Sequence, residues 1–284
     1  MSRTPVAIAP AAPTTDAPSP RTAAPRLASG LLRLLDGLAY SSALAAGIGA
    51  ALSLVASRVL GAPDPVRWAT LTAAGAFCVY TIDRLRDVTR DRATSPRRTA
   101  FVARHRERLV VGLALAASAG GIALVEAPGR VLGLCAVVGA LGLLHRRLKH
   151  VPAAKTLYVS AAWTAACVGI PWLSVGVGAR GGAVVAVLLP TLVANLIASN
   201  LRDGEAQLLR AHPGRVLDLA RGAAGLGVAA ALFGPSPVPA LAWIPVAQLG
   251  ALVGFRAEER YGHVAVDGAL FVGAVASWLQ LGLV

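Results

Sequence analysis

Aspartate residues recur every four positions in the stretch 80–91, directly after a long apolar segment. On an α-helix, the spacing of Asp83, Asp87 and Asp91 places all three carboxylates along one face. Like charges repel, by about 1 kcal/mol at about 4 Å in water and about 4 kcal/mol at an effective dielectric constant of about 20. A cation must therefore lie beside them, and the sequence leaves two sources open. One is a bound divalent metal, and the other is the set of interleaved arginines Arg84, Arg86, Arg90 and Arg92.

A second polar stretch lies farther along the chain. Asn195, Ser199 and Asp203 have the same four-residue spacing and give the apolar segment at 182–201 a polar stripe. Lipid would penalise such a stripe, so we expect it to face protein or a cavity. It leads into the run Asn-Leu-Arg-Asp-Gly-Glu-Ala-Gln at 200–207. Both acidic stretches follow a predicted helix on the same side of the membrane, so they can face each other across one pocket.

Carboxylates and basic side chains on one membrane face suit a metal-bound diphosphate. Mg²⁺ prefers carboxylate oxygens and usually completes its shell with water and substrate phosphates. Phosphate oxygens also need cationic partners, and those on the same side are Arg84, Arg86, Arg90, Lys149 and Lys155. If the diphosphate carries an isoprenoid chain, the chain can lie between apolar helices while the charged head stays at the interface. The metal would stabilise the departing pyrophosphate, and a nucleophile would capture the allylic cation.

The composition is that of a membrane protein. Of the 284 residues, 56% are hydrophobic and 14% are charged, and the mean hydropathy is +0.64, which lies outside the range of soluble domains. The formal net charge of +13 does not indicate a nucleic-acid partner, because the basic residues lie in short blocks between apolar runs. We therefore expect an all-α protein with membrane lipids around it.

Nine apolar segments are long enough to cross or nearly cross a bilayer. They lie at about 37–57, 66–82, 109–125, 131–144, 157–175, 182–201, 219–233, 238–255 and 264–284. Residues 1–30 are rich in Pro, Ala, Thr and Ser, and we expect a disordered cytoplasmic tail there. Residues 31–284 are expected to form a single polytopic transmembrane domain.

The basic residues predict how these segments are oriented. The residues before 37 and the loops at 83–108, 145–156, 202–221 and 256–263 carry all but four of the 27 Lys and Arg residues. The exceptions are Arg58, Arg67, Arg130 and Arg180. This asymmetry favours nine spans with the N-terminus in the cytoplasm and the C-terminus outside. The expected location is a bacterial plasma membrane.

These motifs resemble those of the UbiA superfamily of intramembrane prenyltransferases. The first family motif, Asn-x-x-x-Asp-x-x-x-Asp on the second helix, matches Asp83 and Asp87 but has Val79 in place of the Asn. The second, Asp-x-x-x-Asp on the sixth helix, matches Asp203 and departs at Gln207, so this motif is degenerate. The resemblance covers the second to the sixth predicted helices and agrees with the nine-helix count.

A third likeness lies between the fourth and fifth predicted helices. The run Leu-Lys-His-Val-Pro at 148–152, followed by Lys155 and leading to Trp163, is similar to the Leu-Lys segment of many family members. Taken together, the resemblance implies a UbiA-like helical bundle. It also implies Mg²⁺-dependent transfer of a prenyl group from a prenyl diphosphate to a lipophilic, often aromatic, acceptor.

The resemblance assigns roles to particular residues. It implies that Asp83, Asp87 and Asp203 are the catalytic and Mg²⁺-binding residues. Diphosphate binding is expected from Lys149, Arg84 and Lys155, and further substrate contacts from Tyr80 and Asn200. The residues themselves leave a plainer interpretation open, in which arginines neutralise the aspartates, Asp203 caps a helix or pairs with Arg202, and Lys149 is a membrane anchor.

The two departures leave a second function open. With Val79 and Gln207 at motif positions, the chain could be a catalytically degenerate relative that binds or transports isoprenoid or anionic lipid without turnover. Asp267 is expected to cap the last helix rather than join the site. The cysteines are expected to be small core residues, namely Cys78, Cys135 and Cys167. The histidines are expected to lie solvated in polar loops, namely His105, His145, His150, His212 and His263.

Overall fold

A computed structural model describes residues 30, 34–89, 95–148, 152–176, 178–204 and 212–283. Within these ranges the chain is helical and contains no β-strand. The chain divides into two units, residues 35–284 and residues 1–34. In the latter, only Gly30 and Leu34 are described, both in helical conformation. The disordered tail predicted for residues 1–30 falls almost entirely outside the described residues.

The larger unit is built from helices of widely different length. The first half of the chain forms α2 (Ala43–Leu60), α3 (Pro65–Arg86), α4 (Pro96–Arg104), α5 (Arg106–Leu124) and α6 (Gly129–Leu148). Next, α7 (Pro152–Thr164) runs through the π-helical turn η1 (Ala165–Gly169) into α8 (Ile170–Val175), and α9 spans Ala179–Asp203. The last part forms α11 (Pro213–Leu232), the 3₁₀ turn η2 (Val238–Ala242), α12 (Trp243–Val253), α13 (Glu259–Tyr261), the π-helical turn η3 (Gly262–Val266) and α14 (Asp267–Leu283).

The ends of the two helices that carry the aspartate motifs have clear local causes. Pro65 occupies the first turn of α3, where its fixed φ suits a helix and its missing N–H is not needed. At the other helix, Gly204 has a φ of 61° and its N–H contacts the carbonyls of Asn200 and Leu201. Glycine adopts this left-handed conformation at little cost. Helix α9 therefore ends immediately after Asp203, which leaves that side chain in the last helical turn.

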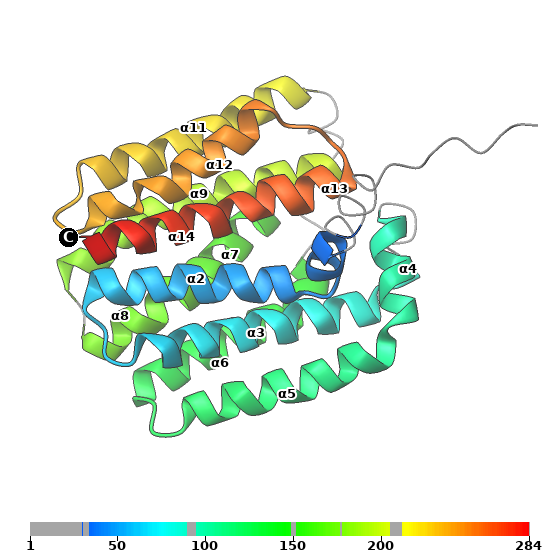
Figure 1. The fold of residues 1–284 in the computed structure, drawn as a ribbon, viewed down its shortest axis with the longest axis horizontal. Helices are drawn as coiled ribbons and strands as arrows, with labels where there is room; N and C mark the ends of the chain where they lie inside the picture. Colours follow the sequence, from blue (N-terminus) through cyan, green and yellow to red (C-terminus); the bar gives the residue numbers. More distant parts are fainter. Residues whose placement is uncertain are drawn as a thin grey trace, which may run out of the picture. The chain divides into compact units, whose positions relative to one another are not determined.

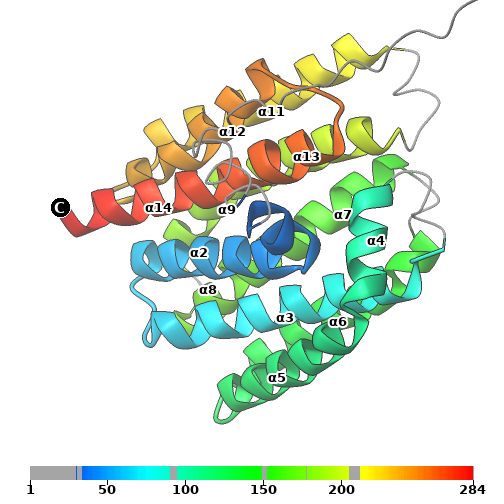
Figure 2. The same ribbon diagram turned by 45° about the vertical axis from the view of Figure 1, so that its right-hand side comes forward.

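The helices of the larger unit run side by side (Figure 1). Helix α2 packs between α3 and α14, and α3 packs against α5 on its other side. Helix α9 contacts α7 and α11, and α12 closes the group between α11 and α14. The turned view shows α4 crossing the ends of α3 and α5 as a short separate helix (Figure 2). The largest buried apolar cluster joins α2, α9, α12 and α14, with Leu52, Leu188 and Ile244 at its centre.

Five helical stretches in the described residues are long and apolar enough to cross a membrane. They are Ala43–Leu60, Arg106–Leu124, Ala154–Val175, Ala179–Asp203 and Glu259–Leu283. On α5, which belongs to this group, Leu115 and Ile122 are exposed to the surroundings, as expected of side chains that face lipid. These features are those of an integral membrane protein.

All nine predicted apolar segments lie almost entirely on helical backbone, so the prediction of an all-α chain is confirmed. Nine membrane crossings remain a prediction, because α3 and α11 are not among the five long apolar stretches, and those at 129–144 and 238–253 are shorter. The sequence did not indicate α4, which lies in the predicted loop at 83–108. Its apolar face is narrow, with Thr99 and Val102 buried among basic neighbours.

Candidate functional site

A cavity of about 610 Å³ lies inside the larger unit. Its polar part is lined by the last turns of α3 and α9, the start of α7, and the turn η3. Asp83, Asp87 and Asp203 all line this one cavity, together with Arg84 and Lys155. The helices thus bring aspartates of the two predicted acidic motifs to the same end of one cavity.

The two α3 carboxylates occupy the C-terminal end of their helix. Asp83 lies in the last turn, and Asp87 is the C-cap, with its N–H donating to the Asp83 carbonyl at 3.0 Å. Asp87 is only 3% exposed, and Asp83 is half-buried. The helix dipole is negative at this end and disfavours carboxylates. Cationic groups are therefore needed close to this pair. Both residues also line a smaller cavity of about 280 Å³ between α3 and α6.

Asp203 is held by its neighbour in the chain. The Arg202 Nε donates to Asp203 Oδ1 at 2.7 Å, and the Arg202 Nη2 donates to Oδ2 at 3.0 Å. The Arg202 side chain is itself buried. Both carboxylate oxygens of Asp203 are therefore engaged in a bidentate pair, which is the plainer of the two arrangements left open by the sequence.

The predicted diphosphate-binding cations differ in how they are placed. Arg84 is buried, donates from Nη1 to the Ala39 carbonyl at 3.0 Å, and lies 5.9 Å from the ring centre of Tyr80. Lys155 lines the polar part of the cavity, and so does Arg98 of α4, which the sequence did not single out. Other predicted positions lie outside the described residues, namely Asp91, Lys149 and Gln207.

Tyr80 and Asn200 line the cavity and have partners within the protein. Trp163 Nε1 donates to the Tyr80 hydroxyl oxygen at 3.1 Å, and the two rings meet edge to face. Asn200 is buried, and its Nδ2 donates to Thr156 Oγ1 at 2.8 Å, which ties α9 to α7. These contacts hold the polar end of the cavity in shape.

The polar stripe of α9 faces the cavity, as predicted. Asn195, Ser199 and Asp203 all line it, and Asn200 does so from the same helix. The stripe continues into a buried network on η3 and α14 that the sequence analysis missed. Asn195 Nδ2 donates to Asp267 Oδ1 at 3.2 Å.

Two expectations for that network were wrong. His263 was expected in a solvated loop, but it is 5% exposed and lines the cavity from η3. Asp267 begins α14, yet its carboxylate contacts Asn195 and His263 and lines the cavity, so it belongs to the site. The four-residue spacing of His263 and Asp267 in the sequence was a signal that could have paired them.

The rest of the cavity is apolar and extends along α3. Leu71 and Asp87 both line it, and they lie about 24 Å apart along the helix at about 1.5 Å per residue. Small residues of α5 and α6 form one wall, among them Gly120 and Gly139. A bound molecule with a polar head and a long apolar tail would match this division.

Cysteine positions only partly follow the prediction of a core role. Cys167 is buried in the main apolar cluster, as expected. Cys78 and Cys135 are only half-buried and line the apolar part of the cavity. These two cysteines, on α3 and α6, therefore belong to the cavity lining rather than to the core.

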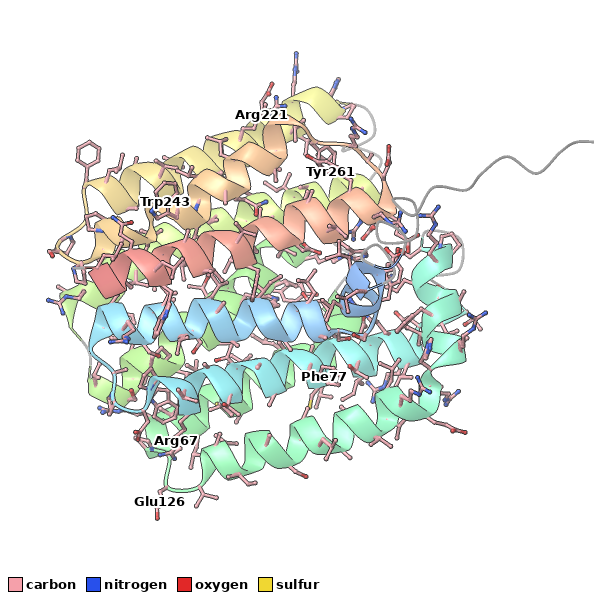
Figure 3. All side chains as sticks on the ribbon, in the orientation of Figure 1. Arg67, Phe77, Glu126, Arg221, Trp243 and Tyr261 are labelled. Atoms are coloured by element: carbon pink, nitrogen blue, oxygen red, sulfur yellow. The ribbon has the colours of Figure 1, made fainter. Side chains whose placement is uncertain are left out.

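Helices α3 and α5 pack closely at two points outside the cavity lining. Phe77 projects from α3 toward α5, where a Cβ on Gly112 would lie 3.1 Å from its ring (Figure 3). At the end of α3 remote from the aspartates, Arg67 Nε donates to the Ala123 carbonyl at 2.8 Å and also bonds Val125, next to Glu126 (Figure 3). This arginine satisfies carbonyl groups at the end of α5, so it has a structural role far from the polar part of the cavity.

The fold and the cavity together describe a helical membrane protein with a site that is charged at one end and apolar along most of its length. No protein-family model, curated protein or solved structure matches the chain. The resemblance to the UbiA superfamily accordingly remains a prediction from the sequence motifs.

Proposed function

We propose that this protein transfers a prenyl group from a prenyl diphosphate to a lipophilic, often aromatic, acceptor, in the manner of the UbiA superfamily. In this proposal its nine helices cross the membrane, and the reaction takes place between them. The observation that carries the proposal is the shared lining of one cavity by Asp83, Asp87 and Asp203, with a long apolar extension behind them. Asp203 and the two α3 aspartates come from helices far apart in the sequence. Their position at one cavity is therefore a result of the fold and not of their being neighbours in the chain.

The two parts of the cavity suit the two parts of such a substrate. Arg84, Arg98 and Lys155 line the charged end, and cationic side chains bind phosphate oxygens through short charge-assisted hydrogen bonds. The prenyl chain would lie along α3 toward Leu71, where burial contributes about 25 cal/mol per Å² of apolar surface.

Mg²⁺ fits the α3 carboxylates better than it fits Asp203. Among the described residues, no three His, Cys, Asp or Glu side chains lie close enough together to hold a metal ion. Mg²⁺ does not require three, since it commonly binds one or two carboxylates and takes its other ligands from water and phosphate. Asp83 and Asp87 would hold it, and Asp203 could join only by giving up Arg202. When bound, Mg²⁺ would neutralise charge on the leaving diphosphate.

Aromatic side chains stand where the charged and apolar parts meet. Tyr80 and Trp163 line the cavity and are joined through the Trp163 indole N–H. The faces of aromatic rings attract cations by about 0.5–2 kcal/mol, most strongly where water is excluded. These rings would stabilise positive charge that develops on the prenyl carbon as its bond to diphosphate breaks.

A second function, lipid binding or transport without turnover, is favoured by two specific features. Both oxygens of Asp203 are taken up by Arg202. Val79 stands where the family motif has Asn, and it packs against α6, where a Cβ on Gly142 would lie 3.0 Å from Val79 Cγ2. In this case the same cavity would hold an isoprenoid or anionic lipid and release it unchanged.

A transfer assay separates the two functions. Purified protein is incubated with a radiolabelled prenyl diphosphate, Mg²⁺ and a panel of aromatic acceptors, and lipid-soluble product is counted. We expect product from the wild type and a loss of roughly 100-fold in Asp83→Ala and Asp87→Ala, the scale of removing one group that stabilises a developing charge. Asp218→Ala is the matched control, because Asp218 is exposed on α11 and pairs with Arg221.

Two results would count against transfer. Product formation unaffected by both α3 substitutions would remove the proposed site. Saturable binding of the labelled lipid that is insensitive to Mg²⁺ and gives no product would favour the second function.

A further inference from the structure

His263 lies at the centre of the buried network beside the cavity. Its Nδ1 is 3.2 Å from Asp267 Oδ2, and Asp267 Oδ1 accepts from Asn195 Nδ2 at 3.2 Å. Asn195 Nδ2 also lies 3.2 Å from the Val266 carbonyl oxygen. An amide on α9 thus fixes the carboxylate at the start of α14, and that carboxylate fixes the imidazole one turn earlier.

The contacts assign a tautomer to His263. Nδ1 also lies 3.4 Å from Arg202 Nη1, and it cannot donate to Asp267 while accepting from Arg202. Because the carboxylate can only accept and makes the shorter contact, we assign the proton to Nδ1. Nε2 then carries the lone pair, as in other sites where a carboxylate orients a histidine.

The other ring nitrogen is not used by the fold. Nε2 of His263 is buried and has no hydrogen-bond partner among the described residues. Leaving such an atom unpaired costs about 1–3 kcal/mol, so its retention needs a reason. His263 lines the same cavity as the three aspartates, while Nε2 itself has almost no accessible surface. A ligand in that cavity becomes its partner when the ring turns this atom toward it.

We propose that His263 accepts the proton that the acceptor loses during prenyl transfer, with Asp267 and Asn195 as positioning residues. The proposal rests on the transfer function above and names the residue that takes up the acceptor's proton.

The reaction breaks one bond and forms another. The bond between the prenyl carbon and the diphosphate oxygen breaks, and its electron pair leaves with diphosphate. The acceptor atom forms a new bond to that carbon, and its proton passes to Nε2. The resulting imidazolium is stabilised by Asp267. The acceptor must therefore carry a removable proton at or next to its reacting atom, as a hydroxylated ring does.

The ratio of prenylated acceptor to prenyl alcohol, here called the product partition, tests this role. The diphosphate ester can break without removal of the acceptor's proton, so diphosphate release and transfer can be separated. Wild type and His263→Ala are given prenyl diphosphate, Mg²⁺ and a hydroxylated aromatic acceptor, and three products are measured: diphosphate, prenylated acceptor and prenyl alcohol. In His263→Ala we expect diphosphate release to persist while prenylated acceptor falls about 100-fold, the scale of general-base catalysis. Prenyl alcohol should rise in its place, and added imidazole should restore the prenylated product.

Two comparisons separate this role from a structural one. His212→Ala is the matched control, since His212 is exposed ahead of α11. Asp267→Asn should shift the partition in the same direction by a smaller factor, because the ring remains but loses its orienting charge. A merely structural defect would lower all products together and would not respond to imidazole.

The outcomes distinguish the two proposals. If the wild type releases no diphosphate and forms no product with any acceptor, the transfer function fails and this inference fails with it. If the wild type transfers prenyl groups and His263→Ala keeps the wild-type partition, or loses diphosphate release in step with transfer and without imidazole rescue, only the role of His263 is overturned.

Discussion

The ion pair of Arg202 and Asp203 sets the charge at one side of the polar cavity end. Its two hydrogen bonds, at 2.7 and 3.0 Å, leave the pair neutral as a unit. Breaking a buried pair by removing one partner typically costs about 3–5 kcal/mol, because the other charge is left uncompensated. Removing either partner alone is therefore expected to destabilise the end of α9.

A double-mutant cycle measures how far the two residues depend on each other. We expect Arg202→Gln and Asp203→Asn each to lower the free energy of unfolding in mixed micelles by about 3 kcal/mol. The double variant should lose much less than the sum. The same cycle on Arg221 and Asp218, an exposed pair on α11, should give a coupling below about 1 kcal/mol.

Additive effects at Arg202 and Asp203 would contradict the pairing. That outcome would mean that the Asp203 carboxylate has another principal partner in the membrane, and a bound cation would then be the first to test.

Single residues differ in how far the sequence could predict them. Asp83 and Asp87 could be assigned to one cavity face because a four-residue spacing stays on one side of a regular helix. His263 could have been paired with Asp267 by its four-residue spacing, but it could not be assigned to the cavity. It lies in the π-helical turn η3, and a hydrophobic pattern read at 3.6 residues per turn does not register the extra residue. The partner of Asp203 was left open, because both a metal and the adjacent Arg202 satisfy its charge.

Among the helices, α6 lines part of the apolar cavity with small residues. Gly139 lines both cavities, and a Cβ there would meet nothing within 4 Å. Gly133 on the same helix is equally open but is exposed and does not line the cavity. A side chain added at Gly139 therefore fills cavity space, and one added at Gly133 serves as a control on the exposed face of the same helix.

Filling the cavity from α6 should shorten the prenyl chain that the protein accepts. Gly139→Leu is expected to weaken use of long-chain prenyl diphosphates by about 10- to 200-fold relative to short-chain ones, the effect of one poorly accommodated apolar group. The measurement is kcat/KM across a series of chain lengths. Gly133→Leu should keep the wild-type profile.

If kcat/KM depends on prenyl chain length in Gly139→Leu as it does in the wild type, the prenyl chain does not pass this position. Equal losses for all chain lengths in both variants would point to damage of α6 rather than to the occupied cavity.

Helix boundaries were predicted well where the apolar run is long and is ended by glycine, proline or charge. Helix α4 was missed because its nine residues are rich in arginine and too short to show a stable period. The small cavity between α3 and α6 was also beyond prediction, because it depends on how closely Val79 approaches Gly142 in space.

The whole molecule presents its charged cavity end on one side of the helix bundle, at the ends of α3 and α9. The excess of Lys and Arg in the loops predicts that this side is cytoplasmic. Nine crossings from a cytoplasmic N-terminus would put the C-terminus outside.

A reporter enzyme fused after residue 284 tests the count of crossings. A reporter that is active only outside the cytoplasm should be active in this position, and one that is active only in the cytoplasm should be silent. The same reporters inserted at 212, ahead of α11, should give the opposite pattern. Matching patterns at both sites would require an even number of crossings between them and would contradict the nine-helix topology.

The most direct test of the account is to locate a bound substrate. The full chain is studied by electron cryomicroscopy with Mg²⁺ and a non-hydrolysable thio-analogue of a prenyl diphosphate. The account predicts density for the diphosphate beside Asp83 and Asp87, and for the prenyl chain along α3 toward Leu71. A headgroup bound anywhere else, or a cavity that stays without ligand at saturating analogue, would contradict it.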